Sequence, residues 1–249
     1  MTTQLSNWFI KMAYKIVPLN KEQHAKTKIL DITSFKFAEK HHIAYITMHE
    51  FARAAAIFPI VFLEDKENNA FRPVVLMGLS EGENLFVSAD GKWNASYVPA
   101  ILRRYPFALV PNGDAGQYVV CIDEASDLVG ETEGKNLFDE HGEPTEVVGN
   151  IKRFLGELQQ MDILTNHFCS FLSEHNMFIP LNMKIRENDV EKNLTGCYVI
   201  NESRLNGLSD ELFLSIKNKN YLPAIYAHLI SLAQTERLVK IKNELVKPD

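Results

Sequence analysis

Between residues 60 and 122 the chain carries several short apolar runs separated by turn residues, and this spacing is the strongest constraint on the fold. Most of the connections are too short for the helical crossover that parallel strands need, so the sheet is predicted to be largely antiparallel. In the first two runs the apolar residues do not alternate with polar ones, which indicates strands covered on both faces. The predicted strands are Ile60–Leu63, Val74–Leu79, Leu85–Ser88, Phe107–Val110 and Tyr118–Ile122.

Before this region the pattern is weaker. Residues 14–19 have strand character, and the chain from there to Tyr45 is expected to be mostly irregular, although Phe35 and Phe37 alternate with polar neighbours as on a half-buried strand. Thr47 and Glu50 have the spacing of a capping box, which predicts a helix start. Pro59 is expected to stop that helix.

After residue 144 the spacing of apolar residues changes to steps of three and four. This predicts a long amphipathic helix, or two helices with a bend, from Thr145 to near Asn176. A second hairpin is expected from residues 179–185 and 195–201, followed by a short helix capped at Ser209. Pro223 suits the first turn of a last helix that runs beyond Val239.

The fold class predicted from these patterns is α+β, with a largely antiparallel sheet in the N-terminal half covered by helices from the C-terminal half. From the order of the predicted elements, residues 1–144 are expected to form a mostly-β subdomain with one short helix. Residues 145–249 form a helical subdomain with a β-hairpin. The two are expected to pack as one compact domain, since 249 residues suffice for a substantial core.

The charge of the chain is concentrated in one segment. The formal net charge is −6, but residues 121–147 hold nine acidic side chains and a single lysine, a net charge of −8. A chain without basic patches is not expected to bind nucleic acid. Within this segment Asp123, Glu124 and Asp127, or Asp139, Glu140 and Glu143, are candidate oxygen ligands for a hard cation. Because neither set has the EF-hand spacing, a solvated acidic loop is preferred and no metal is predicted.

The cysteines and the apolar runs bear on the compartment. Cys121, Cys169 and Cys197 lie far apart in apolar surroundings, which suits reduced, buried thiols in a reducing compartment. The longest apolar run, residues 54–63, is broken by Pro59 and is much shorter than the roughly 18–20 residues that a bilayer span needs. No leader pattern is recognised at the N-terminus. A cytoplasmic location without a membrane span is therefore expected.

A cluster of arginine and aromatic residues is the leading candidate for a binding site. The arginine guanidinium donates two parallel hydrogen bonds to a carboxylate or phosphate and stacks on rings, so this cluster would suit a small anionic ligand. The alternative is that an arginine pairs with the acidic segment while the aromatic rings pack. The candidate residues are Trp93, Tyr97, Arg103, Arg104 and Tyr105.

His228 is the sixth candidate, since it lies close to the apolar stripe of the last helix. It is either a buried histidine bonded to Tyr226 or a backbone carbonyl, or a catalytic base. No nucleophile elbow, activated thiol, phosphate-binding loop or dinucleotide-binding glycine triplet is present. No catalytic residue and no cofactor are therefore predicted, and a binding protein is favoured over an enzyme.

Several separate segments, in the same order, resemble the SapC-like family of bacterial proteins, and the resemblance covers nearly the whole chain. The segments are residues 14–20, 58–62, 75–79, 82–87, 91–93, 97–100, 103–107, 121–123, 137–139, 142–145 and 225–232. The peptide-transporter permease of the same name is a different protein, because a permease needs spanning helices.

The resemblance implies a soluble bacterial protein linked to nutrient uptake, because members of the family often accompany uptake receptors. It also implies two alternatives. One is an enzyme or enzyme accessory that works with a flavin-dependent halogenase-like partner, and the other is a surface-layer-associated protein. It carries over no catalytic residue. The expected partner is a small anionic ligand or another protein, and the oligomeric state stays open.

Overall fold

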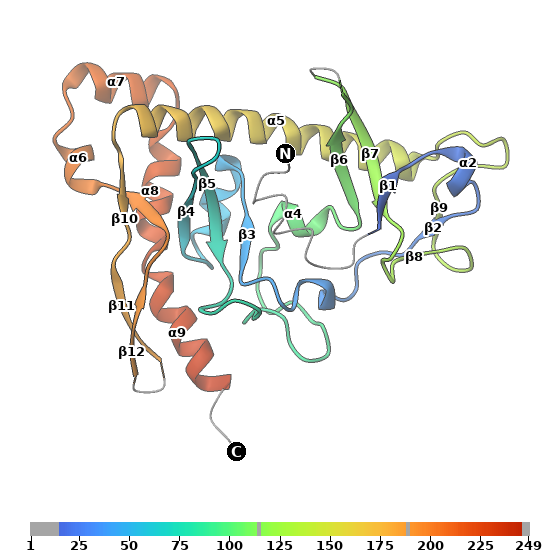
Figure 1. Cartoon of the computed structure of the whole chain (residues 1–249), viewed down its shortest axis with the longest axis horizontal. Helices are drawn as coiled ribbons and strands as arrows, with labels where there is room; N and C mark the ends of the chain where they lie inside the picture. The colour runs from blue at the N-terminus through green and yellow to red at the C-terminus, as the bar shows by residue number, and fades with distance from the viewer. Residues whose placement is uncertain (1–14, 114–115, 188–189, 246–249) are drawn as a thin grey trace. The chain divides into compact units, whose positions relative to one another are not determined.

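The computed structural model describes residues 15–113, 116–187 and 190–245. The chain forms two compact units, each built from two separate segments (Figure 1). The first unit comprises Met1–Thr33 and Leu102–Gln160, and the second comprises Ser34–Ile101 and Met161–Asp249. The sequence-based division at residue 144 groups residues by the type of predicted element, whereas these units group them by contact.

The first unit contains two small antiparallel sheets. One has the strand order β1 (Ile16–Pro18), β7 (Tyr118–Asp123), β6 (Phe107–Pro111), and the other has the order β8 (Val129–Gly130), β2 (Lys28–Ile29), β9 (Lys135–Asn136). Apolar side chains from both sheets and from the first half of helix α5 (Glu146–Glu174) form its core. The fully buried members include Ile122, Leu137 and Val148.

The acidic segment is folded into this first unit. Strands β8 and β9 both come from it and flank β2, and Lys135 binds Asp31 with its Nζ atom 2.7 Å from Oδ1. Gly134, directly before β9, has φ +108°. A Cβ atom at this position would lie 2.5 Å from the Ile29 carbonyl oxygen. Only glycine fits such a close approach of two backbones.

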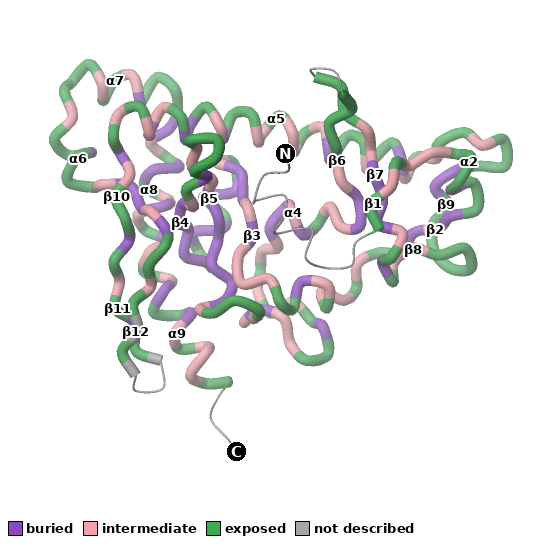
Figure 2. The backbone as a smooth tube through the Cα atoms, viewed as in Figure 1, coloured by how far each residue is buried: buried purple, intermediate pink, exposed green. Residues whose placement is uncertain are grey.

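The second unit is built on a five-stranded antiparallel sheet. Its strand order is β10 (Phe178–Pro180), β13 (Tyr198–Ile200), β4 (Ile60–Asp65), β5 (Ala70–Leu76), β3 (Ile43–Tyr45). Figure 2 shows the buried residues gathered on β4 and β5, as expected for strands covered on both faces. Beyond β10 the chain continues into the β11 (Met183–Glu187) and β12 (Val190–Leu194) ladder.

Helices cover the sheet of the second unit. Helix α8 (Leu222–Ser231) lies against it, since Ser231 accepts the Ile60 N–H at 2.9 Å and His228 accepts the Ile200 N–H at 3.0 Å. Phe168 of α5 packs edge-on against Phe51, with ring centroids 6.1 Å apart. The remaining helical elements are α2 (Lys21–His24), η1 (Lys36–Ala38), η2 (Met48–Glu50), α3 (Phe51–Ala54), α4 (Ala100–Arg103), α6 (Glu202–Asn206), α7 (Asp210–Asn218) and α9 (Gln234–Leu245).

Most of the predicted elements are confirmed. The α+β class and the antiparallel pairing are as expected, and α5 is one helix of 29 residues. The capping box at Thr47 and the N-cap at Ser209 are present, and the second hairpin forms through β10 and β13. The strand predicted for residues 14–19 is β1, although Tyr14 lies outside the described residues. All three cysteines are free and buried.

The strand predicted at Leu85–Ser88 is wrong, since Val87 makes only an isolated bridge to Trp93. Asn84 explains why this segment does not form the predicted strand. Its Oδ1 accepts the Phe86 N–H at 3.0 Å and its Nδ2 donates to the Ala38 carbonyl at 2.9 Å, so a side chain takes the place of a neighbouring strand. The half-buried strand at Phe35 and Phe37 is also wrong, because Phe37 lies in the single turn of η1.

The single last helix that was predicted is in fact two helices, α8 and α9. Ser231 ends the first of them, because its hydroxyl donates to the His228 carbonyl at 2.6 Å while accepting the Ile60 N–H. Such side-chain bonds to the backbone compete with the helical hydrogen bonds. None of the helices in the described part of the chain combines the length and the hydropathy that a bilayer span requires.

Candidate functional site

Trp93 and Tyr97 of the predicted binding cluster lie together in the second unit. The Trp93 indole donates to the Tyr97 carbonyl at 2.9 Å, and its ring stacks on Phe86 with centroids 6.1 Å apart. The Tyr97 hydroxyl donates to Oε1 of Glu50 at 2.7 Å. Glu50 is 6% exposed. The polar atoms of both aromatic side chains thus have partners inside the protein.

The other residues of the cluster belong to the first unit. The Arg103 guanidinium lies 5.5 Å from the centroid of the Phe154 ring, a cation–π contact. The Tyr105 hydroxyl is 3.5 Å from Oδ2 of the buried Asp123, and burial raises the pKa of Tyr105. The Arg104 carbonyl accepts the Phe107 N–H at 2.8 Å. The binding role assigned to these residues stays a prediction.

His228 is a fully buried histidine in the second unit, with 0% exposure. It is hydrogen-bonded as expected, but its partner is the N–H of Ile200 rather than Tyr226 or a carbonyl. Its Nδ1 atom has no hydrogen-bond partner among the described residues. Burial lowers the pKa of His228 to about 4, and the Ile60 backbone offsets this effect only in part. The ring is therefore neutral at physiological pH.

A second polar cluster of this unit lies between β3, β5 and α5. The Tyr45 hydroxyl donates to Asp162 at 2.5 Å, and Arg72 lies 3.9 Å from the same carboxylate while also binding Asn166. Burial and the neighbouring Asp162 raise the pKa of Tyr45. Each charged group in the cluster has an opposite charge or an amide beside it, so the cluster serves to tie the helix to the sheet.

The first unit contains a pocket of about 530 Å³. Its floor is apolar and is the open side of the first unit's core, formed by Leu19, Leu109, Val120, Phe138 and Val148. Its rim carries the polar and charged side chains Asn20, Lys21, Tyr118, Glu143 and Lys152. Pockets of this size, with an apolar lining and a few polar groups, are typical of small-molecule sites.

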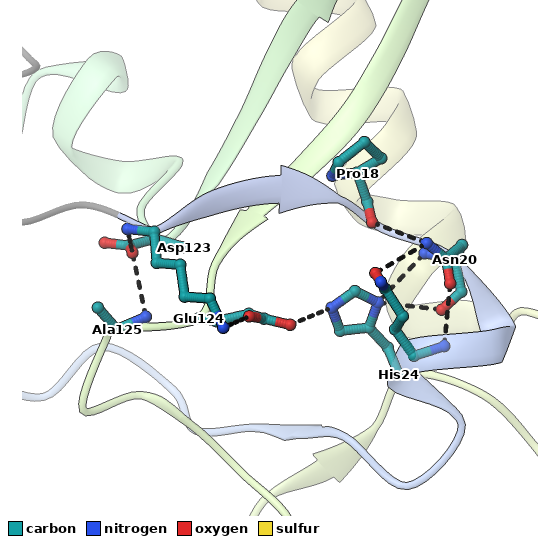
Figure 3. A network of polar contacts seen from close by, with 8 residues as sticks. Pro18, Asn20, His24, Asp123, Glu124 and Ala125 are labelled. Carbon is teal, nitrogen blue, oxygen red and sulfur yellow. Dashed lines mark hydrogen bonds and ion pairs between the residues drawn. The ribbon is translucent and has the colours of Figure 1, made fainter.

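A polar network fixes the turn between β1 and α2, which forms one wall of the pocket (Figure 3). Asn20 caps α2, since its Oδ1 accepts the Gln23 N–H at 2.9 Å. The buried His24 contacts Asn20 through Nδ1 and binds Glu124 through Nε2, at 3.1 Å. Lys15 lies 2.6 Å from the same carboxylate, and its amine lowers the pKa of Glu124. The positions of Asn20 and Lys21 are therefore set by a network that reaches to β7.

Asp123 anchors the other end of this network. It is buried, and its Oδ1 accepts the N–H groups of Lys15 at 2.8 Å and Ala125 at 3.1 Å. Figure 3 shows Asp123 and Glu124 on the same segment, one turned to the strand end and the other to His24. Of the first candidate cation set, two carboxylates are thus occupied by internal donors.

The turn at residues 139–144 forms a further wall. Asp139 accepts the N–H groups of His141 at 2.9 Å and Glu143 at 2.8 Å, and these bonds lower the pKa of Asp139. Gly142 takes the positive φ of +77° that closes the turn. Over the described residues no group of three or more His, Cys, Asp or Glu side chains is placed to hold a metal ion.

Helix α5 supplies the third wall through Val148, Lys152 and Gly156, which share one face because they are four residues apart. A Cβ atom at Gly156 would meet no heavy atom within 4 Å. Glycine inside a helix costs about 0.5–1 kcal/mol relative to alanine. Packing therefore does not require this glycine, and its effect is to leave room in the pocket.

Sequence reasoning did not find this pocket. Its lining residues come from five segments between Leu19 and Gly156, and only Glu143 had been singled out, as a candidate cation ligand. The one available signal was Gly156, a glycine in the interior of the segment predicted as a long helix.

The fold and the pocket define an α+β protein with a site of the size that small molecules occupy. The family profile named SapC matches residues 19–238, so the chain belongs to the SapC family. No curated protein and no solved structure matches the chain.

Proposed function

We propose that the protein is a non-catalytic accessory protein of the cytoplasm that binds a small molecule in the pocket of its first unit and serves nutrient uptake. The pocket carries this proposal, because about 530 Å³ lies within the range of ligand sites and its floor is an exposed part of a hydrophobic core. The three free thiols suit a reducing compartment.

The character of the lining supports binding rather than catalysis by a hydroxyl, thiol or imidazole nucleophile. The lining side chains are aliphatic or aromatic on the floor, and amine, amide, phenol and carboxylate on the rim. None of them is a serine, cysteine, threonine or histidine. Catalysis by a serine, cysteine or threonine nucleophile pairs that residue with a base within hydrogen-bond reach. The polar groups of the pocket rim are suited to orienting a ligand.

Blocking the pocket is expected to abolish binding. We expect the neutral fluorescent probe N-phenyl-1-naphthylamine to bind the wild-type protein, because its rings match the apolar floor. Gly156→Phe is expected to weaken this binding at least about tenfold, since the new ring occupies the space that the glycine leaves open. Fluorescence titration measures both values.

Gly149→Phe is the matched control. Gly149 is a glycine of the same helix with open space around its Cβ position, but it does not line the pocket. This variant is expected to bind the probe like the wild type, and both variants are expected to unfold thermally at or above the wild-type temperature. Equal probe affinity in all three proteins, or no binding to the wild type, would contradict the proposed function.

A further inference from the structure

Two lysines at the rim of the pocket have no carboxylate partner in the described part of the chain. Lys21 comes from the first turn of α2 and Lys152 from α5. Among the described residues, neither amine makes an ion pair or a side-chain hydrogen bond. The network around His24 fixes the backbone of Lys21, and the helix fixes that of Lys152, so both side chains start from fixed positions at the pocket entrance.

Two further polar side chains at the rim, Tyr118 and Glu143, also bear on the charge of the ligand. Tyr118 accepts a hydrogen bond from Gln159 Nε2 at 3.1 Å, which leaves its hydroxyl proton free to be donated to a ligand. Glu143 is the one carboxylate among the lining residues, so the rim has a net charge of +1. Three donors and an excess positive charge favour an anion over a cation.

The floor determines the rest of the ligand. Leu19, Leu109, Val120 and Phe138 present no polar side-chain atom, so a group that fills the pocket must be apolar. A fully hydrophilic anion such as phosphate would leave this floor in water. From these two surfaces, and resting on the proposed binding function, we infer that the ligand is a small amphiphilic monocarboxylate. Its apolar chain lies on the floor and its carboxylate lies between Lys21 and Lys152.

Competition between matched compounds tests the ligand class. In a fluorescence titration, decanoate, octanoate or decylamine is added to the protein to displace bound N-phenyl-1-naphthylamine. Decanoate is expected to bind about tenfold more tightly than octanoate, because two more methylene groups are buried. It is expected to bind at least about tenfold more tightly than decylamine, whose charge is of the wrong sign.

Variants at the rim test the role of the charges. The double variant Lys21→Gln, Lys152→Gln is expected to bind decanoate about tenfold more weakly and the neutral probe unchanged. Glu143→Gln removes the opposing charge and is expected to tighten decanoate binding about two- to threefold. Lys26→Gln removes an exposed lysine of the same unit that does not line the pocket, and should change neither affinity.

The outcomes separate the ligand class from the proposed function. Probe binding that is blocked by Gly156→Phe, combined with equal displacement by decanoate and decylamine, overturns the monocarboxylate and leaves the pocket as a binding site. Failure of both the probe and decanoate to bind overturns both. Phosphatidylglycerol vesicles that sediment the wild type but not the double lysine variant would assign the anion to a membrane surface, and would overturn the small-molecule form.

Discussion

Replacement of Glu50 by alanine is expected to lower the free energy of unfolding by about 3–5 kcal/mol. The buried carboxylate accepts four hydrogen bonds in the second unit: from the Thr47 N–H at 2.8 Å, the Thr47 hydroxyl at 3.1 Å, the Tyr97 hydroxyl at 2.7 Å and the Ala100 N–H at 2.8 Å. Alanine leaves two buried backbone donors without an acceptor, and each such group costs about 1–3 kcal/mol. Because the total stability of a domain is about 5–15 kcal/mol, this is a large fraction of it.

Urea unfolding followed by circular dichroism measures this loss. Glu39→Ala is the matched control, since Glu39 is an exposed glutamate of the same unit, and its effect should stay within about 0.5 kcal/mol. Tyr97→Phe removes one of the four donors and is expected to cost about 1 kcal/mol. A loss below 1 kcal/mol for Glu50→Ala would show that the network around this carboxylate does not hold the unit together.

The second large effect is a loss of stability in acid that depends on His228. In the unfolded chain this histidine titrates near pH 6.5, whereas in the folded protein burial lowers its pKa to about 4. Between these two pH values the unfolded state binds the additional proton, so stability is complete above pH 6.5 and falls as the pH is lowered towards 4. The difference between the two pKa values corresponds to about 3 kcal/mol.

His228→Gln isolates this contribution. The glutamine amide keeps an acceptor for the Ile200 N–H but does not titrate. His41 and His42 also have lowered pKa values through burial, so the wild type loses stability from several sources as the pH falls. The test is to measure the difference in unfolding free energy between wild type and variant at pH 6.5, and to compare it with the same difference at pH 4. If the two proteins follow parallel pH curves, the buried neutral histidine is not a source of acid sensitivity.

The sequence predicted the fold where local signals are strong. The apolar runs gave β4, β5, β6 and β7, and the three- and four-residue spacing gave α5. It failed where one side chain replaces a backbone partner from elsewhere in the chain. Asn84 does so at the strand expected near Leu85, and Ser231 does so at the break between α8 and α9. Asn84 also donates to the Ala38 carbonyl, 46 positions away, and Ser231 accepts the Ile60 N–H, 171 positions away, so no local pattern indicates these bonds.

The pairing of β2 with the acidic segment was unpredictable for a related reason. Strands β2, β8 and β9 have two residues each, which is too short for a periodicity to be recognised. Composition indicated a solvated loop, and the carboxylates of this segment are indeed exposed at many positions. What composition cannot show is the close backbone approach at Gly134, which holds that segment against Ile29.

The site was the least predictable part. The cluster of arginine and aromatic residues was conspicuous because its members are close in sequence, and in the structure Trp93 and Tyr97 bond internally. The pocket is assembled from residues that are unremarkable one by one, such as Leu19 and Val120. A ligand site on the surface of a core leaves little trace in one sequence, because its floor has the same composition as any other apolar surface.

The most direct test of the account is to locate the bound probe. Amide chemical shifts of the ¹⁵N-labelled protein are recorded during titration with N-phenyl-1-naphthylamine. We predict that saturable shifts concentrate on Asn20, Val119, Gly142 and Gly156, which line the pocket from its separate walls. Shifts that cluster instead around Trp93 and Tyr97, or no saturable shifts at all, would contradict it.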